Sequence, residues 1–374
     1  MGLALMFGLL LPHTSTAFML VNPILFVMFI LMKRRKNFCK YGLLPIIAIV
    51  VSLLLNMAGA ATGKSFMMAV AIILCIVAFP IADNAKIKNI YIYLAFAAIF
   101  LSQVAYMFNI GYVASFVDTY YPISWGENFI VRTNENVDIT NYLDYRQGGL
   151  YRNPNQLAKY VTFLLAIYLV NNNKKTIKKQ IWFIALCLFS IVLTGSRTGF
   201  VVSSILFLLS AFSNKRLTRT RRNIVTIVFL GLIIYYALSG FGGRSTAVEA
   251  GLQDSLGAKF WLVIDYLTHE VSALAYLFGH LDYTLFEGSY YTTYNLDCEY
   301  GYIIYCFGFI GFFAFVSFFY KIYRRVDKHN RFFFVVCLWM ISSTIIMSYR
   351  ALFVFMLLLS TIYNKPSNMP EAKR

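Results

Sequence analysis

Arginine and asparagine side chains stand directly before the apolar run at residues 156–170. Arg152, Asn153 and Asn155 surround Pro154 at the start of this run. The residue before a proline is kept out of the helical region and Asn is a favoured N-cap, so the spacing predicts that a helix begins here. Free N–H groups and the dipole at a helix start attract anions, and Arg152 adds a full positive charge. The pattern predicts binding of a phosphate-like group; the alternative is a helix cap beside an arginine that contacts lipid phosphate.

The motif TGSRTG at residues 194–199 also lies between two apolar runs. Ser196 or Thr198 can cap the helix that follows, and Arg197 stands at the start of that helix. An arginine at the end of an apolar segment is costly unless it is paired or faces water. Glycines on both sides allow the backbone to approach a ligand closely. The motif predicts either a second anion site or an ordinary hairpin turn with an arginine that reaches the surface.

Further arginines occur at the ends of apolar runs and in a connecting loop. Arg244 lies in SGFGGR, Arg350 in MSYRA, and Arg146 in the loop before the first motif. A planar guanidinium binds phosphate through two parallel hydrogen bonds and does not lose its charge. If these side chains converge with the arginines of the two motifs, we expect a pyrophosphate site, to which Ser196 also belongs.

Three side chains near the start of the apolar run 300–320 could accept a proton. They are Asp297 and Glu299, which lie just before the run, and His280 in the motif LFGHLDY. A carboxylate or an imidazole within hydrogen-bond reach of a hydroxyl acts as a general base. Acids before a helix are also ordinary caps, because they interact favourably with the positive end of the helix dipole. The sequence leaves the choice among the three open.

Long apolar segments must position these side chains. The chain is 59% hydrophobic and 13% charged, whereas soluble domains have about 25% charged residues. Apolar runs of roughly 15 to 21 residues recur, and each can cross a hydrocarbon core about 30 Å thick. The sequence predicts an all-α protein, a polytopic membrane helical bundle of eleven spans, or twelve if residues 2–11 also cross. The expected spans are 14–32, 42–58, 66–82, 90–108, 156–170, 181–195, 198–212, 224–239, 300–320, 332–347 and 349–363.

Basic residues are distributed unevenly along the chain. The formal net charge is +17, and the Lys and Arg clusters occupy every second gap between the apolar runs, whereas most acids occupy the other gaps. Loops rich in Lys and Arg stay in the cytoplasm. The charge is therefore a topology signal and not a nucleic-acid-binding surface, and we expect no nucleic-acid partner.

The gaps predicted to lie outside include two long segments, residues 109–155 and 240–299. Residues 258–278 are expected to lie along the membrane face, since a further span would invert the later basic loops. We treat residues 1–374 as one integral membrane domain. The sequence has no Gly-rich phosphate loop and no cysteine spacing typical of zinc, so we expect no cofactor and no metal. Any chemistry should take place on the outer side.

Several short motifs follow one another in a fixed order. They are RNPNQLA (152–158), LTGSRTG (193–199), FGGR (241–244), Trp261, LFGHLDY (277–283) and DCEYGYIIYCFGFIGFF (297–313). In order and spacing they resemble the O-antigen ligase/polymerase superfamily, especially the Wzy-like polysaccharide repeat-unit polymerases, over residues 140–320. The first four spans are similar to that family only in hydropathy.

The resemblance implies a GT-C-like membrane fold and a metal-independent inverting glycosyltransferase of the bacterial cytoplasmic membrane. The implied substrate is an oligosaccharide on undecaprenyl pyrophosphate at the outer face, and the implied partners are a chain-length regulator and a flippase. By position, Arg152, Arg197 and Arg244 would hold the pyrophosphate and stabilise it as the leaving group. Asn153 and Asn155 would shape the entrance to the site.

The alternatives to a polymerase are the ligase of the same superfamily, a flippase or transporter, and a non-catalytic scaffold. The ligase branch of the family has a histidine shortly before the last motif, and residues 294–299 contain none, which favours polymerase. A flippase or transporter should have polar residues in mid-span and repeated halves, whereas the spans here are almost purely apolar. A non-catalytic scaffold would not need arginines clustered on the outer side.

Overall fold

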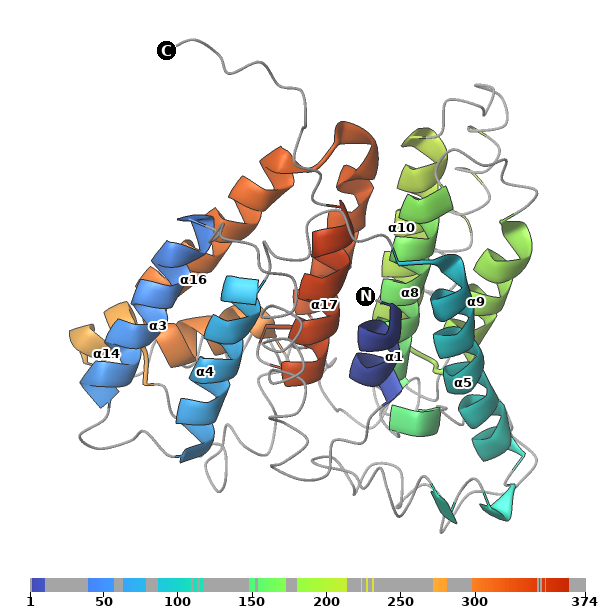
Figure 1. Ribbon diagram of the computed structural model, residues 1–374, viewed down its shortest axis with the longest axis horizontal. Coiled ribbons are helices and arrows are strands. Elements are labelled where there is room, and N and C mark those ends of the chain that lie inside the picture. The colour runs from blue at the N-terminus through green and yellow to red at the C-terminus, as the bar shows by residue number, and fades with distance from the viewer. Residues whose placement is uncertain are drawn as a thin grey trace.

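The structure is a computed structural model that describes most of the apolar runs and few of the connecting residues. The described residues are 2–10, 40–56, 63–78, 87–108, 110–112, 115–116, 148–151, 154–172, 180–213, 223, 227, 231, 272–280, 298–341, 343, 345–346 and 348–362. Helices make up the secondary structure of this part of the chain, which has no strand (Figure 1). The predicted all-α class is therefore confirmed for the described residues.

The helices coincide closely with the predicted apolar runs. Their bounds are α1 (Gly2–Leu10), η1 (Lys40–Gly42), α3 (Leu43–Asn56), α4 (Gly63–Ala78), α5 (Asn89–Met107), η4 (Gly149–Tyr151), α8 (Pro154–Asn172), α9 (Ile181–Leu193), α10 (Arg197–Ser213), α14 (Ala273–Phe278), α16 (Glu299–Arg325), η6 (Lys328–Ile341) and α17 (Tyr349–Ile362). The predicted span 14–32 lies outside the described residues, as do nearly all of the span 224–239 and most of both long loops.

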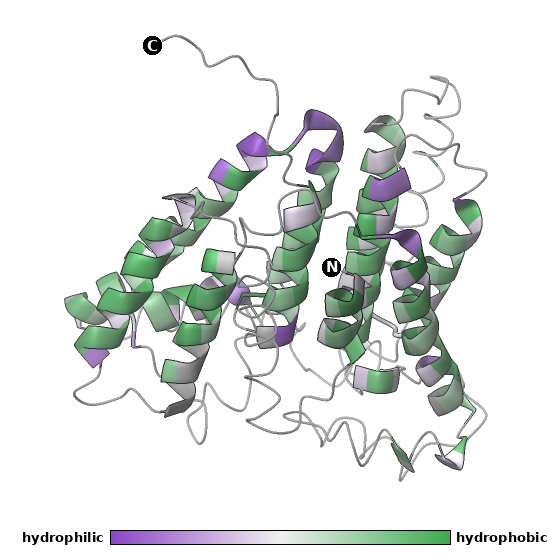
Figure 2. Cartoon of the chain, in the orientation of Figure 1, coloured by the Kyte–Doolittle hydropathy of each residue, from purple (hydrophilic) through white to green (hydrophobic). Residues whose placement is uncertain are grey.

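One helix of the described part, α16, is long and apolar enough to cross a membrane. Several other apolar helices are shorter, between 10 and 17 residues: Leu43–Asn56, Asn89–Ala105, Ile181–Leu193, Arg197–Phe212 and Arg350–Ile362. Hydrophilic residues are concentrated near the helix ends (Figure 2). The polytopic arrangement of eleven or twelve spans remains a prediction.

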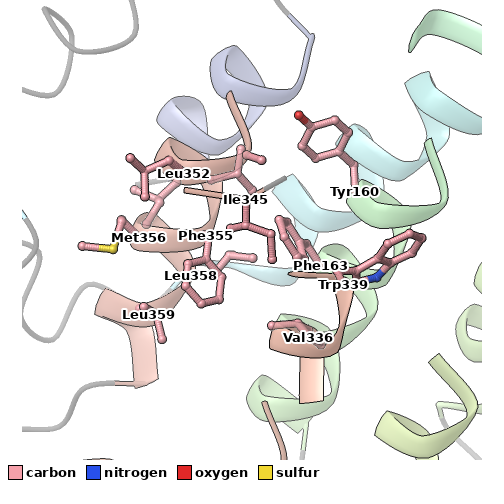
Figure 3. Packing of buried hydrophobic residues seen from close by; sticks show 14 of the residues in the cluster. Tyr160, Phe163, Val336, Trp339, Ile345, Leu352, Phe355, Met356, Leu358 and Leu359 are labelled. Carbon is pink, nitrogen blue, oxygen red and sulfur yellow. The ribbon is translucent and has the colours of Figure 1, made fainter. Parts of the chain in front are cut away.

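The helix α8 lies at the centre of the packing. It contacts α5, α9, α10, α17, η4 and η6, and its residues from Leu157 to Leu169 are all buried. A helix that is apolar on nearly every side is expected to be enclosed by others, and residues 157–169 of α8 have this pattern apart from Lys159 and Thr162. Phe163 of α8 packs against Phe355 of α17 with ring centroids 6.0 Å apart (Figure 3).

Hydrogen bonds between side chains join neighbouring helices inside the apolar core. Gln103 of α5 donates to the Ser190 carbonyl of α9 at 2.9 Å, and the Ser190 hydroxyl donates back to Gln103 Oε1 at 2.7 Å. Thr162 of α8 and Ser203 of α10 share a hydrogen bond of 2.9 Å. Buried polar groups are retained when each has a partner, so these bonds fix the height of α5 relative to α9 and of α8 relative to α10.

The helix α16 is interrupted at Gly308, which has φ 64° and ψ −174°. An interruption frees backbone carbonyls that must find other donors. The Tyr305 carbonyl accepts from the backbone N–H of His280 at 2.8 Å. The Cys306 carbonyl accepts from the Ser52 hydroxyl of α3 at 3.1 Å. The segment after α14 and the helix α3 therefore complete the hydrogen bonding of the broken turn.

Two glycines allow the backbones of α14 and α16 to touch. A Cβ at Gly279 would lie 2.3 Å from the Cys306 carbonyl carbon, and one at Gly308 would lie 2.3 Å from the Leu277 carbonyl carbon. Gly279 also has a positive φ of 77°, and its carbonyl accepts from Asn56 Nδ2 of α3 at 3.3 Å. We call this contact of residues 277–280 with 305–308 the α14–α16 joint.

The predicted span 332–347 differs from the observed structure. The described helical run begins earlier, at Lys328, is a 3-10 helix, and ends at Ile341. Ser, Ser and Thr at positions 342–344 compete for backbone hydrogen bonds and disfavour continuation of a helix. The backbone N–H groups of Ile345 and Ile346 bond instead to the side chain of Glu299. The described residues between η6 and α17, namely Ser343, Ile345, Ile346 and Ser348, are called the η6–α17 turn below.

Candidate functional site

The start of α8 agrees with the prediction from the asparagine–proline motif. The helix begins at Pro154, and Asn155 and Gln156 in its first turn are partly buried. Arg152 and Asn153 lie outside the described residues. The backbone before the helix is fixed by Leu150, whose N–H donates to the Ser102 hydroxyl at 3.0 Å.

Ser196 caps α10, one of the two alternatives predicted for the TGSRTG motif. Its hydroxyl accepts from the backbone N–H of Gly199 at 3.2 Å, and its own N–H donates to Thr194 Oγ1 at 3.1 Å. Gly195 makes the turn with a φ of 60°. The second glycine, Gly199, faces Ala158 of α8. Its predicted role, close approach to a ligand, is thus replaced by close approach of two helices.

Alanine at Gly199 is expected to destabilise the contact between α8 and α10. The new Cβ would lie 3.1 Å from Ile191 Cγ2 and 2.8 Å from Ala158 Cβ, which is fixed to the backbone and cannot rotate away. Overpacking of this kind lowers the free energy of unfolding by about 1–3 kcal/mol. This loss outweighs the gain of up to about 1 kcal/mol that alanine brings through its better helix propensity. The unfolding temperature of the purified protein in detergent measures the loss. Gly231→Ala, where nothing lies within 4 Å, is the control, and equal stability of both variants would contradict the prediction.

Arg197 is the first residue of α10 and is partly buried. Its Nε is buried and has no hydrogen-bond partner in the described part of the chain. An enclosed guanidinium N–H without an acceptor is costly, and an anion at the start of the helix would supply one. The position of Arg197 therefore fits the predicted anion-binding role.

Glu299, the first residue of α16, is completely buried. Its Oε2 accepts the backbone N–H of Ile346 at 2.9 Å and also that of Ile345. The carboxylate thus satisfies two N–H groups that a continuing helix would have satisfied. It holds the η6–α17 turn against the start of α16 across 46 residues of sequence.

Lys159 of α8 is a second completely buried charged residue. Its Nζ donates to the Ser343 hydroxyl in the η6–α17 turn at 3.1 Å and lies 5.5 Å from the centre of the Tyr160 ring. The sequence motifs did not single out Lys159. Its isolation within the otherwise uncharged run 156–170 is the signal that could have identified it.

Arg350 lies in the first turn of α17 and is 2% exposed. Its guanidinium carbon is 5.2 Å from the centre of the Tyr151 ring. That ring packs on Tyr160 at 4.6 Å, and the Tyr151 hydroxyl donates to the Leu9 carbonyl at 2.9 Å. Tyr160 shares a side-chain hydrogen bond with Ser348 and lies within electrostatic range of Arg350.

Lys159, Glu299 and Arg350 are the fully buried charged side chains among the described residues. They come from three different helices, α8, α16 and α17, and all three belong to or contact the residues from Ser343 to Arg350. Two of the charges are positive and one is negative. The three side chains together carry one net positive charge, which attracts an anion such as phosphate.

His280 lies at the α14–α16 joint and not at the η6–α17 turn. Its ring is partly buried and its centroid is 5.2 Å from that of Tyr305. Tyr305 follows Glu299 by six residues in the same helix, which corresponds to about 9 Å along the axis. The backbone N–H and the ring of His280 both contact Tyr305 of α16.

The remaining predicted site residues are not placed by the structure. Arg146, Arg244 and Asp297, like the two residues before Pro154, lie outside the described residues. Of the predicted set, the structure brings Glu299 and Arg350 to one turn. It adds Lys159 and two tyrosines, 151 and 160, which the sequence motifs did not indicate.

Comparison of the chain with protein-family models, with curated proteins and with solved structures finds no match in any of the three.

Proposed function

We propose that this protein is a membrane-embedded polysaccharide polymerase that joins oligosaccharide repeat units carried on undecaprenyl pyrophosphate. The observation that supports this proposal most strongly is that the buried Lys159 and Glu299 both bind the η6–α17 turn, which leads directly to the buried Arg350 at the start of α17. Such a cluster, with excess positive charge at the starts of inward-running helices, suits a diphosphate. Arg197 at the start of the neighbouring helix α10 adds a further guanidinium beside α8.

A location in a lipid bilayer is part of the proposal. Large apolar side chains on the outside of the helices are well exposed, including Leu54, Leu101, Trp182 and Phe313, which are 63–80% exposed. Extended apolar surface of this kind is unusual on soluble monomers. The alternation of basic and acidic loops further supports a multi-pass arrangement, with the candidate site on the face away from the cytoplasm.

The reaction follows from the chemistry of the diphosphate. An acceptor hydroxyl of one repeat unit attacks C1 of the sugar on another carrier. A new C–O bond forms, the C1–O bond to phosphate breaks, and its electron pair stays on the diphosphate oxygen. Preorganised cations lower the barrier because they meet charge that develops on this leaving group. The hydroxyl proton passes to a base, for which Asp297, Glu299 and His280 are the sequence candidates.

Deletion of the gene, followed by gel electrophoresis of the surface polysaccharide, tests the proposal. Polymerase function predicts that the ladder is replaced by a single repeat unit on the lipid anchor. A bare anchor would point instead to a ligase, which uses the same diphosphate chemistry, or to a flippase. An unchanged ladder would contradict the proposal. Restoration of the ladder by the plasmid-borne gene is the control.

A further inference from the structure

We propose that Lys159, Tyr160 and Glu299 form a clamp on the η6–α17 turn that sets the position of Arg350 on the substrate diphosphate. In this assignment Glu299 is a positioning residue and not the proton acceptor. The inference rests on the proposed function for the identity of the ligand. The inference goes beyond the proposed function because it assigns a positioning role to three residues that act through Arg350.

The clamp holds the turn at three successive points. Lys159 binds Ser343, Glu299 binds the backbone of Ile345 and Ile346, and Tyr160 binds Ser348. Two of the three clamp residues are neighbours on α8, and the third is the first residue of α16. Arg350 follows the last held residue by two positions, so little freedom remains between the clamp and its guanidinium.

Burial makes each of these contacts difficult to lose. Lys159 and Glu299 have no exposed surface, Tyr160 is 1% exposed, and Ile345 and Ile346 are equally enclosed. Figure 3 shows Ile345 and Tyr160 among the buried side chains of the apolar core. In such surroundings a donor or acceptor that loses its partner cannot recover one from water. The turn is therefore held in one conformation.

The geometry of Glu299 argues against its use as a base. A base must reach the hydroxyl proton that it removes. One oxygen of Glu299 already accepts two backbone N–H groups, so this carboxylate is engaged in holding the turn. Protonation of this carboxylate in each catalytic cycle would weaken the charge-assisted hydrogen bonds that hold the turn.

The Tyr151 ring beside Arg350 is compatible with binding of phosphate by the Arg350 guanidinium. The Arg350 guanidinium carbon lies over the Tyr151 ring, 5.2 Å from its centre, and this ring is itself fixed by Tyr160 and by the Leu9 carbonyl. Stacking uses the face of a guanidinium, whereas bidentate binding of phosphate uses its edge, so both contacts can exist together. The clamp and the Tyr151 ring together determine the direction of the guanidinium edge of Arg350.

The test compares purified wild-type protein with Tyr160→Phe and Glu299→Gln variants in lipid nanodiscs. The donor is the lipid-linked repeat unit extracted from the deletion strain, and initial rates are measured against its concentration. We expect the KM for the donor to rise about tenfold in each variant, with kcat changed less than about threefold, because the binding arginine is misplaced. Tyr320→Phe, on an exposed position of α16, is the matched control and should leave both constants unchanged.

Two results would overturn the clamp. One is a fall of kcat by about a hundredfold or more with an unchanged KM in Glu299→Gln, as expected for loss of a general base. The other is unchanged constants in Tyr160→Phe. If Glu299→Gln does not fold, as judged by gel filtration, Tyr160→Phe alone decides the question.

Binding of inorganic pyrophosphate separates this inference from the proposed function. The shift of the unfolding temperature on titration with pyrophosphate gives an apparent Kd without any turnover. The clamp predicts that the Kd rises about tenfold in Tyr160→Phe and stays unchanged in Tyr320→Phe. If the wild-type protein binds pyrophosphate but makes no polymer, the polymerase proposal is wrong. The clamp still stands in that case if the Kd rises in Tyr160→Phe. A protein that does neither refutes both.

Discussion

Alanine at Gly308 is expected to prevent the accumulation of folded protein. The φ of 64° and ψ of −174° at this position belong to a region that only glycine occupies readily, and other residues pay about 1–3 kcal/mol there. In addition, the Cβ would lie 2.3 Å from the Leu277 carbonyl carbon, a backbone atom that cannot rotate away. The summed cost of more than about 3 kcal/mol is a large part of the roughly 5–15 kcal/mol that stabilises a typical domain. Yield after gel filtration in detergent and the unfolding temperature measure the effect.

Controls for this experiment are present in the same chain. Gly111→Ala places a Cβ where nothing lies within 4 Å, and we expect its yield to equal that of the wild type. Gly279→Ala strains the other side of the α14–α16 joint and should fail in the same way as Gly308→Ala. Normal yield and stability of Gly308→Ala would show that the two backbones do not meet as described.

The contrast between these two glycines and the predicted motifs shows what the sequence could reveal. LFGHLDY was singled out for its histidine, whereas in the structure its glycine determines how α14 meets α16. A contact between backbones leaves no trace in hydropathy or charge. It appears only when residues 277–280 and 305–308 are placed side by side.

Helix positions were largely predictable, because they depend on local properties of the chain. Pro154 and Ser196 stand at or just before the observed starts of α8 and α10, as the capping pattern required. Among the described residues, the apolar runs gave α3, α4, α5, α9, α16 and α17 within a few residues, since long uncharged segments admit little other structure. The exception is the run that ends at residue 347, where the chain leaves the helix at Ile341 because a distant carboxylate binds its N–H groups.

The candidate site was predicted in part. Arginines at helix starts were recognisable from their spacing, and Arg350 does lie at such a start. The sequence could not pair Glu299 with Ile346, or Lys159 with Ser343, because these partners are 47 and 184 residues apart. An isolated lysine within an apolar run is ambiguous until its partner is known, and the same is true of an acid at the start of a helix.

Lysine at Arg197 is expected to lower kcat for polymerisation by about 10²–10³-fold, the usual effect of removing one donor to a developing negative charge. The substitution keeps the positive charge and the length of the side chain. It removes the planar fork that binds two phosphate oxygens at once, together with the buried Nε donor. Because Ser196 supplies the helix cap through its own hydroxyl, the start of α10 should not change.

The same exchange at an exposed arginine distinguishes chemistry from general effects of charge. Arg324 is exposed and lies in the basic last turn of α16. The Arg324→Lys variant should therefore catalyse polymerisation at the wild-type rate. Rates are compared in nanodiscs with the same lipid-linked donor, at equal amounts of protein that elutes as a single species. If Arg197→Lys is as active as Arg324→Lys, bidentate binding at the start of α10 is not needed. In that case the positive charge of this end, which lysine retains, would be sufficient to hold the diphosphate, and the arginines of the remaining motifs would carry the specific contacts.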